Sequence, residues 1–168
     1  MAKIIERHAI NDDFAKETST VAKYNMGAEI EVADTETGYT TTYRYIKASA
    51  ALTANQPYVL VEKAEEIGTA SPATSTTVAK IIGIPQVGIA SGSYGFVAVK
   101  GICKAKTGIQ AKGDTLEVIN AGTTLIVDGS SGSPAETVGT VAISAEAATA
   151  AATVDVILLG KRVQIAAS

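Results

Sequence analysis

Apolar and polar residues alternate along much of the chain, and this spacing of two predicts short β-strands. Ile30 and Val32 alternate with glutamates across Ala28–Ala33, and the Thr- and Tyr-rich stretch Tyr39–Lys47 follows after turn residues, which predicts a hairpin. Further strands are predicted at Tyr58–Lys63, Thr77–Ile84, Val87–Ala90, Phe96–Lys104, Thr115–Ile119, Leu125–Val127, Val138–Ser144 and Val154–Leu159. The predicted fold class is therefore all-β.

The pattern also repeats. Gly38–Val61 aligns without a gap on Gly95–Val118 at one offset, 95 − 38 = 57, and the matches include a Gly–aromatic pair and a Lys–Ala pair. A small sheet cannot bury its apolar face alone, so two related units should pack together or close as a sandwich or as barrels. The predicted division is an extended N-terminal arm over 1–27, β units over 28–84 and 85–160, and a short C-terminal tail over 161–168.

The first 27 residues differ from the rest because charged residues are spread among isolated apolar ones. Asn11 could cap a short helical turn over Asp12–Glu17. We expect an arm that becomes ordered on a neighbouring molecule, and a disordered terminus is the alternative. The residues that we expect at an interface with a neighbouring molecule or subunit are Ile4, Ile5, Ile10, Phe14, Val21, Tyr24, Val163 and Ile165.

Charge and apolar run lengths exclude some partners. The net charge is −3 with a pI near 5.2, and the lysines are scattered, so nucleic acid is not an expected partner. The longest apolar run, Val156–Leu159, is far shorter than the roughly 20 residues that span a bilayer, and no signal peptide is evident. We expect no membrane partner and synthesis in the cytoplasm.

Residues that could carry chemistry are few. One histidine and one cysteine are too few for a zinc site, and His8 lies in the predicted arm whereas Cys103 lies in a predicted strand, so we expect no Cys–His pair, no cofactor, no metal and no enzymatic activity. Cys103 lies within a predicted strand and is expected to be a small buried residue rather than a reactive thiol. The stretch Asp128–Gly132 is expected to be a loop tip rather than a phosphate-binding loop.

Three stretches, Lys104–Val118, Thr137–Ile143 and Thr153–Gly160, together resemble the decoration (cement) proteins of tailed-bacteriophage capsids. The shared succession is a turn with Gly–Asp and a strand, a Val–Gly element, and a final Val-x-Val strand; here Ala142 falls one place late in the second element. The resemblance implies a structural protein on the outside of the virion, bound to the major capsid protein and often a homotrimer at a threefold or quasi-threefold axis.

Two other functions fit the composition. One is another virion structural part, such as a tail, head-completion or fibre-base protein. The other is a carbohydrate-binding β module, which would need exposed aromatic rings, and the tyrosines here gather in Tyr39–Tyr45 and at Tyr58 and Tyr94.

Overall fold

The computed structural model describes residues 6–8, 14–34, 38–61, 66–67, 80–118, 123–128, 137–138, 140–160 and 162–165. The all-β prediction is confirmed, because these residues form fourteen strands and a single 3-10 turn. The elements of the first half are β1 (Glu6–His8), η1 (Phe14–Lys16), β2 (Thr18–Ser19), β3 (Glu29–Ala33), β4 (Thr40–Ala48), β5 (Tyr58–Val61), β6 (Glu66–Ile67) and β7 (Lys80–Pro85). Those of the second half are β8 (Tyr94–Thr107), β9 (Thr115–Val118), β10 (Leu125–Val127), β11 (Thr137–Val138), β12 (Ala142–Ser144), β13 (Ala152–Leu158) and β14 (Arg162–Ile165).

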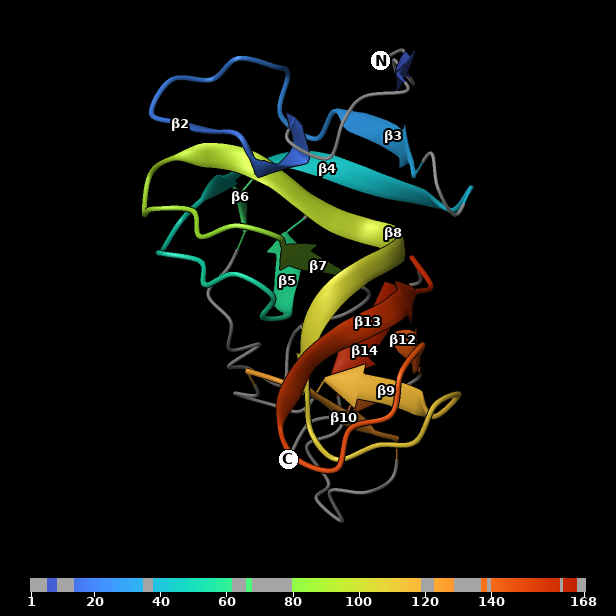
Figure 1. The fold of residues 1–168 in the computed structure, drawn as a ribbon. Helices are drawn as coiled ribbons and strands as arrows, with labels where there is room; N and C mark the ends of the chain where they lie inside the picture. The colour runs from blue at the N-terminus through green and yellow to red at the C-terminus, as the bar shows by residue number, and fades with distance from the viewer. Residues whose placement is uncertain are drawn as a thin grey trace.

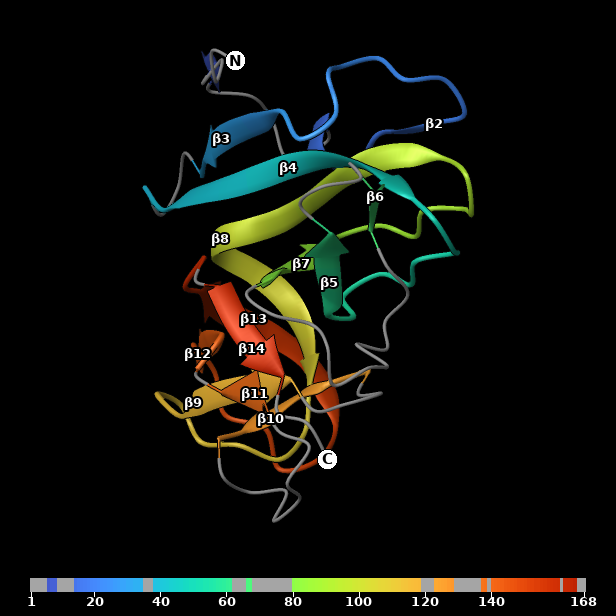
Figure 2. The same ribbon diagram turned by 180° about the vertical axis from the view of Figure 1, so that it is seen from behind.

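The strands close into two rings that share β8. In the first ring, β4 pairs with β8, β8 with β7, β7 with β5, β5 with β6, and β6 returns to β4 in parallel. In the second ring, β8 pairs with β13, β13 with β12, β12 with β9, β9 with β10, and β10 returns to β8 in parallel. Figures 1 and 2 show β8 running from one ring into the other. Of the two arrangements left open by the sequence, the barrel is the one that forms.

The two rings have the same pairing order, and their registers can be compared residue by residue. Leu52 bridges to Ile89 in the first ring, and Gln110 bridges to Ala148 in the second. These equivalents lie 110 − 52 = 58 and 148 − 89 = 59 residues apart. The ungapped offset of 57 in the sequence alignment is therefore one or two residues short. A slip of two leaves every side chain on the same face of a strand, which is why alternation alone did not reveal it.

At Gly101, β8 passes from the first ring to the second. This glycine has a φ of +93°, and a Cβ there would collide with the carbonyl oxygen of Thr40 and lie 2.8 Å from the Thr41 Cα. The pairing between β4 and β8 shifts register at this point, and the Thr41 hydroxyl donates to the Ile102 carbonyl at 2.6 Å. Only glycine fits this close approach without displacing backbone, so Gly101 allows one strand to serve both rings.

One prediction about the strands before β8 is wrong. Val87–Ala90 does not form a strand, and only Ile89 makes a bridge. The chain instead turns after Pro85, and the side chain of Gln86 pairs with the backbone of Lys104: its amide donates to the Lys104 carbonyl at 3.1 Å, and the Lys104 N–H donates to its oxygen at 3.0 Å. An amide side chain thus takes the place of a strand along this edge of β8.

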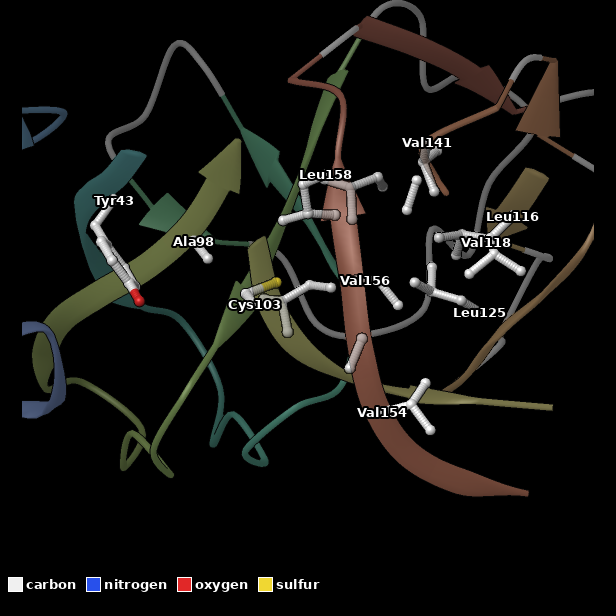
Figure 3. Packing of buried hydrophobic residues seen from close by; sticks show 14 of the residues in the cluster. Tyr43, Ala98, Cys103, Leu116, Val118, Leu125, Val141, Val154, Val156 and Leu158 are labelled. Carbon is white, nitrogen blue, oxygen red and sulfur yellow. The ribbon is translucent and has the colours of Figure 1, made fainter. Parts of the chain in front are cut away.

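Each ring is filled by small aliphatic side chains. A cluster on the strands of the first ring comprises Ile46, Ala48, Leu52, Tyr58, Leu60, Ile89, Val97 and Val99. A larger cluster fills the second ring and continues to Tyr43 and Ala98 on the first (Figure 3). The buried apolar residues are mainly Val, Ile, Leu and Ala, and the two rings share one continuous part of the core.

Candidate interaction surface

Residues 14–33 lie on this chain's own first ring. They comprise most of the described part of the predicted arm and the first strand after it. Ala15 in η1 is fully buried, and β2 pairs antiparallel with the start of β8, with Thr18 opposite Gly95 and Ser19 opposite Tyr94. Farther towards the N-terminus, β1 pairs in parallel with β3. Order on a neighbouring molecule stays a prediction, since the structure contains one chain; in that chain this segment covers the outer face of β4 and β8 (Figure 1).

An aromatic cluster holds this segment in place. The ring of Tyr24 contacts Tyr45 edge-on at 5.2 Å between centroids and Phe96 at 5.5 Å, and Tyr45 lies 5.0 Å from Phe96. The backbone N–H of Lys23 donates to the Tyr45 hydroxyl at 3.0 Å. Such aromatic pairs are worth about 0.5–1.5 kcal/mol beyond their buried area, so they fix the loop that precedes β3.

The predicted interface residues at the N-terminal end are in different surroundings. Val21 is 69% exposed, and Tyr24 keeps 39% of its surface in contact with solvent while one side packs on the aromatic cluster. Phe14 is described only as backbone of η1. Ile4, Ile5 and Ile10 lie outside the described residues. Val21 and Tyr24 are thus available to a partner from the same loop.

At the C-terminal end, the two predicted interface residues lie in strand β14. Val163 is opposite Lys80 of β7, and Ile165 is opposite Thr137 of β11. The predicted tail therefore contains a strand that joins the sheet at β7, although its side chains are not described. The backbone of Arg162–Ile165 is part of the body of the protein.

The structure also exposes apolar side chains that the sequence analysis did not select. Ile109 is 71% exposed and Tyr39 58% exposed, and Ile157 on β13 is exposed to a smaller extent. Ile109 follows Gly108 directly after β8, and this position in a turn was the feature of the sequence that could have predicted its exposure. The alignment at an offset of 57 obscured it, because that offset paired Ile109 with the buried Leu52.

Most tyrosines are unavailable for stacking on a sugar. Tyr43, Tyr45 and Tyr58 are buried, and Tyr94 is half-buried against Tyr45 with the Lys47 ammonium 5.9 Å from its ring. The tyrosines that a carbohydrate-binding module would need on its surface thus lie largely in the core. Tyr24 and Tyr39 are the exposed tyrosines.

The groups that could carry chemistry are isolated from one another. Cys103 is buried, as predicted, and burial raises the pKa of its thiol well above the ordinary value, with a smaller contribution from the charge of Asp155. Glu117 is fully buried on β9 between two residues of the ring core. Across the described part of the chain, no three His, Cys, Asp or Glu side chains gather as a metal site would require.

Ion pairs join neighbouring strands. Arg44 on β4 donates twice to Glu29 on β3, at 2.7 and 3.1 Å, in a mostly buried position. Lys104 on β8 pairs with Asp155 on β13 at 3.1 Å in an exposed position, where such a pair contributes little. No helix in the described ranges is long and apolar enough to cross a membrane.

These features define an all-β protein made of two five-stranded rings fused through one strand, with short strands added at its margins. No protein-family model matches the chain, and no curated protein matches it. Among solved structures, it is similar to the head fibre gp8.5 N base of bacteriophage phi29, at 12% identity over 73% of this chain and 97% of that chain, with a TM-score of 0.46. At this identity and TM-score, the likeness assigns no function.

Proposed function

We propose that the chain is a structural protein of a phage virion that binds the outer surface of the assembled capsid and stabilises it as a homotrimer, without enzymatic activity. The observation that carries the proposal is the position in the structure of the three stretches that resemble decoration proteins. Lys104–Val118 contains the last four residues of β8 and all of β9, and Thr153–Gly160 includes most of β13. Thr137–Ile143 contains β11, which pairs with β14 outside this ring, and the first two residues of β12. Each of the three stretches, although they lie apart in sequence, thus contributes residues to strands of the second ring, as a real family likeness would require.

Exposed apolar residues next to an ordered scaffold support the same function. Val21 and Tyr24 extend from a loop that β2 and the aromatic cluster anchor at both ends. Burying such a side chain on a capsid subunit would contribute about 1.5–3 kcal/mol. A single contact of this size is weak, but three copies in a trimer would bind simultaneously and raise the apparent affinity by orders of magnitude.

Binding to virions of the source phage tests the proposal. Virions stripped of the protein would be mixed with the purified chain and sedimented, and the mass of the free chain would be measured by light scattering. We expect a trimer that sediments with assembled shells and not with free capsid subunits. Val21→Ser with Tyr24→Ser should weaken sedimentation, whereas Tyr39→Ser, directly before the first residue of β4, is the matched control.

Other outcomes separate the alternatives. Rings or tubes in electron micrographs, or binding to tails or fibre attachment points, would favour another virion structural part. Clear hits on a glycan array would favour the carbohydrate-binding module. A monomer that binds neither shells nor any other virion part would refute the proposal.

A further inference from the structure

The start of β13 has an open backbone edge at Thr153. In the antiparallel ladder with β8, Thr153 lies opposite Lys106 and Asp155 opposite Lys104. The Lys106 N–H donates to Asn55 and the Lys104 N–H to Gln86, so both point away from β13. The members of such pairs point outwards together, and the backbone N–H and carbonyl of Thr153 therefore face away from β8.

The outward backbone edge of β13 is occupied at Asp155 and open at Thr153. At Asp155, the carbonyl accepts from the Ala145 N–H at 3.0 Å, and the N–H donates to the Glu146 carboxylate at 3.3 Å. Strand β12 pairs only with Val156–Leu158. On this side of β13, no described residue bonds to the backbone of Thr153, which is exposed.

The first ring shows what occupies the equivalent edge. Tyr94 of β8 lies opposite Lys47, as Thr153 lies opposite Lys106. The two positions are 153 − 94 = 59 residues apart, which is also the spacing between Ile89 and Ala148. The Ala48 N–H donates to the Ser93 carbonyl, so the backbone of Tyr94 also points away from its ladder. There, Ser19 of β2 is its antiparallel partner. An extended segment with small hydroxyl side chains thus completes this edge in the first ring.

The shared strand explains why the second ring differs. Residues 14–33 precede β4, which is the first strand of the first ring. They can therefore fold back and pair with the open edge of that ring at the start of β8. The first strand of the second ring is the continuation of β8, so the residues before it already belong to the first ring. Fusion through β8 therefore removes the segment that would occupy the edge at Thr153.

We propose that the backbone edge at Thr153 binds an extended, uncharged segment of a capsid subunit, antiparallel to β13, as β2 is to β8. This rests on the proposed capsid-binding function. Pairing with the same edge of a second copy would stop after one residue, because the next outward donor, the Asp155 N–H, is already bonded to Glu146. The area buried by such a short pairing is far below the roughly 1,000 Å² of a stable interface. A contact this short suits a lattice that repeats it many times. The exposed residues 149–152 leave room for an approaching backbone.

Proline at this position tests the edge selectively. Thr153→Pro removes the outward N–H and spares the ladder to β8, because proline is tolerated where an edge N–H faces solvent. Thr153→Val keeps the N–H and a β-branched side chain and is the matched control. We expect wild type and Thr153→Val to sediment equally with stripped virions, and Thr153→Pro to bind at least about fivefold more weakly. In wild type, hydrogen exchange at the Thr153 amide should slow at least about tenfold on the virion.

The possible results are distinct. Unchanged binding by Thr153→Pro, with unchanged exchange at Thr153, overturns the edge proposal and leaves capsid binding intact. A change in the mass of free Thr153→Pro would identify a second copy as the occupant and also overturns it. Failure of wild type to bind overturns the proposed function and this inference together. If Thr153→Pro does not fold, the exchange of the wild-type amide decides alone.

Discussion

Replacing Gly101 with alanine is the sharpest test of how one strand serves two rings. The new Cβ would collide with the Thr40 carbonyl oxygen and lie 2.8 Å from the Thr41 Cα, and both contacts are with backbone that no rotamer change can move. Overpacking of this kind costs about 1–3 kcal/mol. The φ of +93° adds about 1–3 kcal/mol for any residue with a side chain.

We therefore expect Gly101→Ala to lose about 2–6 kcal/mol, a large part of the roughly 5–15 kcal/mol that stabilises a domain. Two controls separate the causes. Gly113 has a φ of +91° with nothing within 4 Å, so Gly113→Ala should lose only the strain. Gly108 has ordinary contacts at 3.7 Å and no positive φ, so Gly108→Ala should be nearly neutral. Urea unfolding followed by circular dichroism measures all three, and equal losses at Gly101 and Gly113 would refute the role of the close approach.

Two further predictions concern single side chains. Cys103 should react with a thiol reagent at least about a hundredfold more slowly in the folded protein than in urea, and rapid labelling of the native protein would contradict this. The stability of the fold should also decrease as the pH rises above the ordinary thiol pKa of 9.0, because only the unfolded thiol ionises there. The same decrease in Cys103→Ala would show that another group is responsible. Tyr45→Phe removes the acceptor of the Lys23 N–H and should cost about 0.5–1.5 kcal/mol in thermal unfolding; an unchanged melting temperature would contradict this.

Local patterns predicted much of the fold. The hairpin of β3 and β4 forms as the alternation indicated, with Glu29 opposite Arg44. The short strand β10 has the predicted bounds, and β5, β9 and β13 differ from their predicted bounds only at their ends. These segments were predictable because alternation and turn residues are properties of a few neighbouring residues.

What the sequence did not reveal depends on distant residues. The strand expected at Val87–Ala90 is replaced by the side chain of Gln86, whose partner Lys104 is remote in sequence. The sharing of β8 depends on Gly101 meeting the backbone of Thr40, and a lone glycine in a strand pattern has several explanations. The edge at Thr153 becomes visible only when the registers of both rings are known.

The fusion of the rings leads to a last prediction, about cooperativity. Although the sequence pattern predicts two related units, β8 contributes hydrogen bonds to both rings, and one core cluster includes Tyr43 and Ala98 of the first ring and Val156 of the second. Neither ring can lose β8 without opening the other, so we expect a single calorimetric transition whose van't Hoff and calorimetric enthalpies agree.

A truncating substitution in either ring should lower the temperature of that same transition. Leu116 lies in the second ring and Ile89 in the first, and each is fully buried. Leu116→Ala or Ile89→Ala should cost about 2–5 kcal/mol, which for a chain of this size lowers the melting temperature by several degrees. The transition temperature should be the same whether unfolding is followed by the tyrosine signal or by the overall β-sheet signal. The tyrosines all lie in the first half of the chain or at the start of β8, so their signal reports on the first ring. If Leu116→Ala instead produced two transitions, with the tyrosine signal unchanged, the rings would be independent domains and the shared strand would not couple them.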